Sequence, residues 1–220
     1  MPRPAPALHP ASRARLNEFY DSALARFGPR HSMAVWWASR WAQERRFAVL
    51  AEVGPWDGAT VADVGCGLGD LFGFLEARGL NVRYEGYDIN ARMLEAARAK
   101  HAHPRARFVL RDVVATGLPR RFDYVVASGT FNVRVLGHAA YMRRALEAMY
   151  ARCRRAVAFN VLTPIPPGHP DEELMLRLYG KRLFYHTQLG PLAAWCRRLA
   201  RRVEVRTGYR EWDASLLLFR

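Results

Sequence analysis

The sequence predicts an α/β protein built around one largely parallel sheet. Short apolar segments typical of buried strands alternate with segments whose apolar residues recur at helical spacing. A glycine-rich turn directly follows the first of these strands, and the break between the last two is too short for a crossover helix. We therefore expect six parallel strands and one antiparallel C-terminal strand, with helices on both faces of the sheet.

The expected strands are short and rich in valine, alanine and leucine. They lie at 61–64, 82–87, 107–110, 122–127, 156–161, 203–207 and 214–219. The polar, Gly/Pro-containing stretch at 55–60 marks the start of this pattern. Because residues 209–213 leave room for a turn only, the last two strands should pair as an antiparallel hairpin.

Helical spacing of apolar residues predicts the connecting elements. We expect helices at 16–27, 33–53, 70–78, 90–100, 139–152 and 192–200. Asn90 is a suitable N-cap for the fourth of them, and Gly79 is a suitable end for the third. The first two helices precede all the strands.

The chain of 220 residues has the size of one domain, which we place at 15–220. Its N-terminal helices, 15–54, should form a cap over the sheet. The proline-rich stretch that opens the segment 163–190 predicts a loop and makes the segment a candidate lid. Residues 1–14 contain four prolines and no apolar core of a secretory signal, so we interpret them as a flexible tail.

The composition restricts the class of protein. No apolar run approaches the ~20 residues of a membrane-spanning helix, so we expect a soluble protein without a membrane partner. Three cysteines without CxxC spacing indicate neither a disulfide framework nor a metal site, which favours a reducing, cytoplasmic location. The net charge of +14 could indicate a nucleic-acid partner, but the arginines are spread along the chain, as expected of solvated helix faces.

The segment VADVGCGLGD at 61–70 carries the clearest chemical signal. It predicts a strand, a glycine-rich turn and the start of a helix, where backbone N–H groups can bind a carboxylate. The glycines are spaced G-x-G-x-G, and Asp70 stands where a dinucleotide-binding turn has its last glycine. Asp63 and Asp70 would repel a pyrophosphate and attract a sulfonium or ammonium group, so we expect a ligand that carries positive charge.

This segment resembles motif I of class I S-adenosylmethionine-dependent methyltransferases, and the elements expected in that family follow it along the chain. The resemblance implies a Rossmann-like seven-stranded methyltransferase sheet and S-adenosylmethionine as the cofactor. It also implies that the turn holds the methionine part of the cofactor. The residues implicated in this turn are Asp63, Gly65, Cys66, Gly67 and Gly69.

Two acidic residues after the next strands match the family's nucleoside-binding positions. The resemblance implies that Asp88, with Ile89 beside it, accepts hydrogen bonds from the ribose hydroxyls. It implies that Asp112 accepts from the adenine amine while Val113 packs on the ring. From the residues alone, Asp88 could instead cap a helix and Asp112 could be an ordinary loop aspartate.

The segments 128–133 and 158–163 follow the fourth and fifth expected strands, where ligands of parallel sheets bind. Ser128 and Gly129 should border the transferable methyl group. Together with Trp37 and the residues after it, these segments resemble a little-characterised group of bacterial methyltransferases. Trp37 should cover the cofactor, or else belong to an apolar stripe that packs on the sheet.

Methyl transfer is an in-line displacement that needs alignment more than a covalent catalyst. We therefore expect a methyltransferase acting on a small molecule; an RNA methyltransferase using the arginine-rich faces and a non-catalytic cofactor-binding scaffold are the alternatives. No catalytic residue is identified by a motif. The polar candidates near the acceptor are Tyr20, Asn132, Tyr185, His186 and Tyr209.

Overall fold

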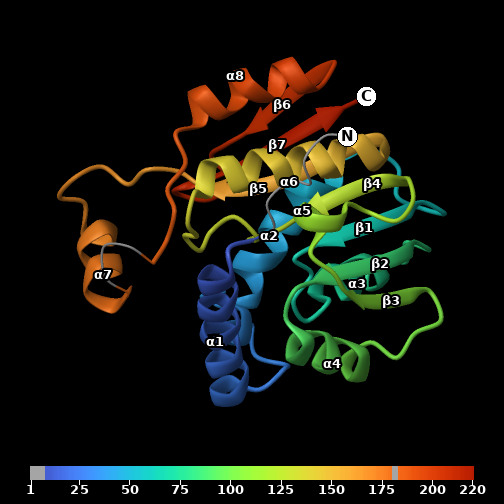
Figure 1. Ribbon diagram of the computed structural model, residues 1–220, viewed down its shortest axis with the longest axis horizontal. Coiled ribbons are helices and arrows are strands. Elements are labelled where there is room, and N and C mark those ends of the chain that lie inside the picture. The colour runs from blue at the N-terminus through green and yellow to red at the C-terminus, as the bar shows by residue number, and fades with distance from the viewer. Residues whose placement is uncertain (1–7, 180–182) are drawn as a thin grey trace.

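The computed structural model describes residues 8–179 and 183–220, which fold around one seven-stranded sheet (Figure 1). The strands are β1 (Thr60–Val64), β2 (Arg83–Asp88), β3 (Ala106–Leu110), β4 (Phe122–Ala127), β5 (Cys153–Leu162), β6 (Arg202–Arg206) and β7 (Asp213–Phe219). Their order across the sheet is β3-β2-β1-β4-β5-β7-β6. β7 runs antiparallel to both β5 and β6, while the other pairs are parallel, so the predicted fold class is confirmed.

The helices cover both faces of this sheet. They are α1 (Pro10–Phe27), α2 (Arg40–Leu50), α3 (Asp70–Glu76), α4 (Ala91–Lys100), α5 (Val113–Thr116), α6 (His138–Arg152), α7 (Pro170–Tyr179) and α8 (Leu189–Leu199), with 3-10 turns η1 (Ser32–Val35) and η2 (Ala51–Val53). Residues of α2, α3 and α4 form one hydrophobic core against the sheet, and residues of α5, α6 and α8 form the other. The core strand β1 is buried at every position, as expected of a parallel strand covered on both faces.

Helix α1 begins earlier than the sequence predicted. Residues 10–14, assigned to the flexible tail, form its first turns, and Leu8 before it is only 3% exposed. His9 accepts a hydrogen bond from the amide of Ala11, and Pro10 needs no N–H partner at the first helical position. These contacts explain the order of 8–14; residues 1–7 of the expected tail lie outside the described residues.

The helix expected at 33–53 is interrupted. The 3-10 turn η1 ends at Trp36, whose φ of +58° is incompatible with a continuing helix. Ser39 then caps α2, its hydroxyl oxygen accepting from the amide of Ala42 at 3.1 Å. This break turns the chain so that α1 and η1 lie beside α4, while α2 packs on the sheet (Figure 1).

The segment proposed as a lid contains α7, which lies away from the body of the sheet (Figure 1), and an extended stretch at 183–187. That stretch joins the loop after β4 to the end of β5: Phe184 forms a bridge with Val133, and His186 forms one with Leu162. Residues 180–182 of the proposed lid fall outside the described residues. Within the described part of the chain, no helix has the length and apolar character needed to cross a membrane.

Candidate functional site

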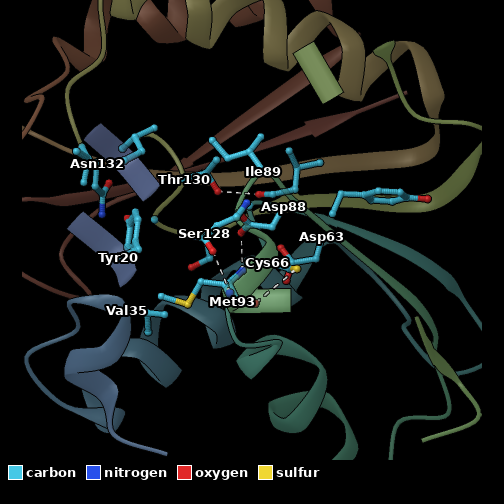
Figure 2. A pocket seen from close by; sticks show the side chains of 18 of the residues that line it. Tyr20, Val35, Asp63, Cys66, Asp88, Ile89, Met93, Ser128, Thr130 and Asn132 are labelled. Carbon is cyan, nitrogen blue, oxygen red and sulfur yellow. Dashed lines mark hydrogen bonds between the residues drawn. The ribbon is translucent and has the colours of Figure 1, made fainter. Parts of the chain in front are cut away.

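A deep pocket lies at the carboxyl ends of β1, β2 and β4. These ends meet where the strand order reverses, since β2 and β3 extend to one side of β1 and β4 and β5 to the other. Such switch points are where open α/β sheets bind ligands. Helix α1, the turn η1 and Phe184 also line the pocket. Figure 2 shows Tyr20 of α1 and Val35 of η1 in this lining.

The glycine-rich turn after β1 approaches its neighbours too closely for side chains. Gly65 has a φ of +73°, and a Cβ built there would lie 2.5 Å from Oγ1 of Thr130. Gly67 has a φ of +51°, and its added Cβ would meet Val35 at 3.3 Å. Both glycines line the pocket, so the turn presents bare backbone to that space.

Asp88, at the end of β2, holds this turn in place through a hydrogen bond. Its Oδ2 accepts from the amide of Gly67 and its Oδ1 from the amide of Asn90, each at 2.9 Å. Burial raises the pKa of this carboxyl group, an effect that these amides oppose. Asp88 thus shapes the glycine turn and also lines the pocket beside Ile89, where its remaining lone pairs can accept from hydroxyl groups.

Asp63, in β1, lines the pocket and is held by a neighbouring phenol. The hydroxyl of Tyr84 donates to its Oδ2 at 2.6 Å. Burial raises the pKa of Asp63 to about 7, with smaller contributions from Asp88 and Asp70, while the hydrogen bond from Tyr84 opposes the rise. A cation bound here would favour the ionised carboxylate.

Asp70 and Cys66 complete the wall on this side. Asp70 begins α3 and accepts from Nε2 of Gln43 at 2.8 Å and from the ammonium of Lys100. Cys66 lines the pocket, and burial raises the pKa of its thiol well above the ordinary value, so it is protonated at neutral pH.

Asp112 has partners that the sequence did not reveal. Its Oδ1 accepts from the amides of Val114 and Ala115 and so caps the short helix α5. Its Oδ2 is 2.5 Å from Nη2 of Arg13 on α1. Asp112 and Val113 both line the pocket.

The loop after β4 faces the cap. Ser128 and Gly129 line the pocket, and the amide of Gly129 donates to Oδ1 of Asn160 at 2.7 Å. A Cβ built on Gly129 would lie 2.6 Å from Cζ2 of Trp37, so the indole rests on this glycine. Arg46 lies over the other part of the same indole, 4.3 Å from its ring. Trp37 therefore lines the pocket between the loop after β4 and Arg46 of α2.

Four predicted residues do not line the pocket, because other contacts hold them elsewhere. Gly69 precedes α3, and its added Cβ would meet the ring of Phe108 at 2.6 Å. Tyr185 stacks on His138, with 3.9 Å between ring centroids. His186 pairs with the end of β5 at Leu162, and the hydroxyl of Tyr209 is 2.8 Å from that of Ser215.

The candidates Tyr20 and Asn132 do line the pocket (Figure 2). Burial, followed by the charge of Asp88, raises the pKa of Tyr20 above its ordinary value, so the phenol keeps its proton and acts as a donor. Sequence reasoning missed Asn17 and Phe184, which also line the pocket. Asn17 lies three positions before Tyr20 and shares its helix face, a signal that was available. Phe184 had no such signal.

A doubly wound sheet closed by an antiparallel strand, with this glycine turn and pocket, defines the fold of class I methyltransferases. Residues 61–158 match the family model described as a methyltransferase domain. This match agrees with the resemblance to class I S-adenosylmethionine-dependent methyltransferases seen in the sequence.

Similar proteins support the same assignment. A putative methyltransferase of Mycobacterium tuberculosis, Rv1506c, is 36% identical over 112 residues, which cover 49% of this chain and 65% of that protein. The structure resembles the magnesium protoporphyrin IX methyltransferase of Synechocystis with bound SAH, with a TM-score of 0.66, 15% identity and coverage of 95% and 99%. It also resembles the pyocyanin biosynthetic protein PhzM, with a TM-score of 0.65, 18% identity and coverage of 91% and 61%. At these identities the two structures establish the fold alone.

Proposed function

We propose that the protein binds S-adenosylmethionine in this pocket and transfers its methyl group to a small molecule by in-line displacement. The observation that carries the proposal is the turn formed by Gly65 and Gly67, in which the amide of Gly67 donates to Asp88. The open backbone of this turn suits the methionine part, and Asp88 and Ile89 suit the ribose. Three neighbouring carboxylates, Asp63, Asp70 and Asp88, suit a ligand with positive charge.

The chain's residues would align the reactants and exclude water. When bound, S-adenosylmethionine would supply a methyl carbon whose bond to sulfur breaks, leaving its electrons on sulfur, as the acceptor atom bonds to that carbon. Trp37 covers Gly129, beside which we place that methyl group, and Tyr20 faces the same space as a donor. Orientation of this kind accounts for ~7–11 kcal/mol in well-aligned reactions, so a covalent catalyst is not required.

Calorimetric titration with S-adenosylmethionine and S-adenosylhomocysteine is the direct test. We expect both to bind with dissociation constants well below about 1 mM, and Asp88→Asn to weaken both. Gln188 precedes α8 and is not among the residues that line the pocket, so Gln188→Ala is a suitable control for non-specific effects of substitution. Absence of binding by the wild-type chain would overturn the proposal.

The pairing of surface arginines favours a small acceptor over RNA. Several arginines on the surface are paired with carboxylates of the same protein, which leaves less charge for phosphate contacts: Arg40 with Glu44, Arg120 with Glu85, Arg202 with Glu204, and Arg206 with Glu52. The test is RNA binding at increasing salt. A steep decrease of affinity with salt, as several phosphate contacts produce, would favour the RNA methyltransferase instead.

The third reading, a cofactor-binding scaffold without activity, makes a separate prediction. A scaffold would bind S-adenosylmethionine and transfer nothing, whereas an enzyme should label a component of a pooled metabolite extract from methyl-labelled cofactor. We expect label in a small-molecule fraction. Cofactor binding without any labelled product would support the scaffold.

A further inference from the structure

Uncharged polar side chains from two segments line the pocket. Asn17 and Tyr20 come from α1, and Ser128 and Asn132 come from the loop after β4. Figure 2 shows Tyr20 and Asn132 on the same side of the pocket, away from Asp63. Two segments more than a hundred residues apart therefore present hydrogen-bonding groups to one space.

Three of these groups are buried without a hydrogen-bond partner. Among residues 8–179 and 183–220, no partner exists for Oδ1 of Asn132, Oγ of Ser128 or Oδ1 of Asn17. Asn132 is only 8% exposed, so water reaches it poorly. Leaving a buried polar group unpaired costs about 1–3 kcal/mol, and three such groups lining one pocket indicate a ligand that pairs with them.

The position of Asn132 relates this wall to the transferable methyl group. Its Nδ2 would lie 3.7 Å from a Cβ built on Gly129, the residue that Trp37 covers. Its main-chain oxygen accepts from the amide of Tyr185 at 2.8 Å, and the next residue, Val133, bridges to Phe184. The extended stretch at 183–187 therefore holds Asn132 in place.

The charges around this wall favour an uncharged acceptor over an anionic one. Of the residues described, Arg111 is the cation lining the pocket, and its Nε donates to the main-chain oxygen of Gly117 near Asp112. Arg134 lies close to this wall but is not part of the lining: it donates to the main-chain oxygen of Phe184, and its guanidinium lies 5.0 Å from the ring of Tyr185. An anion here would find the guanidinium of Arg134 only outside the lining, and the carboxylates deeper in the pocket would repel it.

Apolar side chains of neighbouring segments also line the pocket. They are Leu16 of α1, Val133 of the loop and Phe184. An apolar, ring-sized body would pack against them, while a polar group on its edge reaches Asn132. Sites with this combination take their affinity from the apolar surface and their orientation from the few polar groups.

We propose that this wall is the acceptor subsite and that it takes an uncharged small molecule with an apolar ring and a neutral hydrogen-bonding group, oriented by Asn132. The proposal rests on the proposed function, since the subsite is defined by its position beside the methyl group. It adds the chemical class of the acceptor, which the methyltransferase fold leaves open.

The test compares two probes of the same ring size, phenol and benzoate, on protein saturated with S-adenosylhomocysteine. We expect ligand-observed NMR to detect phenol at about 10 mM and to give an affinity about tenfold above that of benzoate. Asn132→Leu, which keeps the volume and removes the amide, should weaken phenol about fivefold, the effect of one neutral hydrogen bond. Tyr20→Phe provides a second variant with the same expected direction.

Two measurements separate failure of the subsite from failure of the proposed function. Affinity for S-adenosylhomocysteine should stay within about twofold in Asn132→Leu, and the exposed Asn81→Ala should change neither affinity. If the wild-type chain fails to bind S-adenosylhomocysteine, the proposed function is wrong. If it binds, but phenol is undetected, or benzoate binds equally well, or both variants bind phenol normally, the subsite assignment is overturned.

Discussion

The two sides of the pocket are held together in different ways. The turn side is formed by the ends of β1 and β2, and its central contact, from the amide of Gly67 to Asp88, joins residues 21 positions apart. The cap side depends on Trp37, which rests on Gly129, and on Arg46, which binds Asp213 across 167 positions. The turn side therefore depends on the backbone conformation of one turn and its contact with the neighbouring strand. The cap side depends on packing between segments that are far apart in the sequence. Substitutions on the two sides should differ accordingly in their effects on ligand affinity and on folding.

The largest effect should follow from breaking the buried ion pair on the cap side. Arg46 and Asp213 are linked by contacts of 2.5 and 3.1 Å, and their side chains are 5% and 1% exposed. Arg46→Met leaves the carboxylate with the more exposed Arg210 as its remaining ionic partner among the described residues. We expect a loss of about 3–5 kcal/mol in the free energy of unfolding, measured with urea.

The exposed pair of Arg40 and Glu44 on the same helix supplies the control. Arg40→Met should cost no more than about 0.5 kcal/mol, because its side chain is 81% exposed. Equal losses in the two variants would show that the buried pair does not anchor the cap. Should Arg46→Met fail to fold, Asp213→Asn offers a milder change at the same contact.

The turn side should respond mainly through ligand affinity. Gly65→Ala places a Cβ within 2.5 Å of Thr130 at a φ of +73°, so the turn must deform. We expect affinity for S-adenosylhomocysteine to fall by about 100-fold, corresponding to about 2.7 kcal/mol, as measured by calorimetry.

Gly58→Ala is a matched control for backbone strain. Gly58 has a similar φ of +70° but open space around the added Cβ. It should lose stability through strain and keep its affinity for the ligand within about twofold. A similar loss of affinity in both variants would mean that strain, and not the shape of the turn, limits binding.

A smaller effect is expected when the aromatic cover is removed. Trp37→Leu takes away the indole between Gly129 and Arg46, and we expect affinity for S-adenosylhomocysteine to fall about tenfold. Trp41→Leu changes a tryptophan that is 63% exposed and outside the pocket, so its affinity should not change. The interpretation of Trp37 as a cover is untenable if both variants bind like the wild-type chain.

The smallest effect is a pH dependence of cofactor binding. The pKa of Asp63 is about 7, so in the empty protein this group is largely protonated below that pH. A cationic ligand favours the carboxylate and lowers its pKa, so binding should release protons at pH 6.5. Affinity for S-adenosylmethionine should accordingly rise a few-fold as the pH increases through about 7 and then level off.

Calorimetry in two buffers with different ionisation enthalpies measures this proton release directly. Asp63→Asn should abolish it, because an amide cannot titrate. Proton uptake by the wild-type chain, or unchanged release in the variant, would show that Asp63 does not sense the charge of the ligand.

The sequence was most informative where the residues of a single strand or turn determine its structure. The residues of β1, the glycine turn after it and the acid ending β2 were predicted in their correct places. The prediction was weaker where a partner was distant. Asp112 pairs with Arg13, 99 positions away, and this contact leaves no local pattern in the sequence. Tyr185 and His186 were candidates by type, yet the bridges at 183–187 direct them away from the pocket.

The sequence by itself determined the order of strands and helices, the antiparallel closing hairpin and the glycine turn, because these depend on local periodicity and on backbone that only glycine tolerates. Only the tertiary structure decided that η1 and α2 are separate, that Phe184 closes the pocket and that Asn132 faces it unpaired. Those features depend on which distant surfaces meet when the cap packs on the sheet.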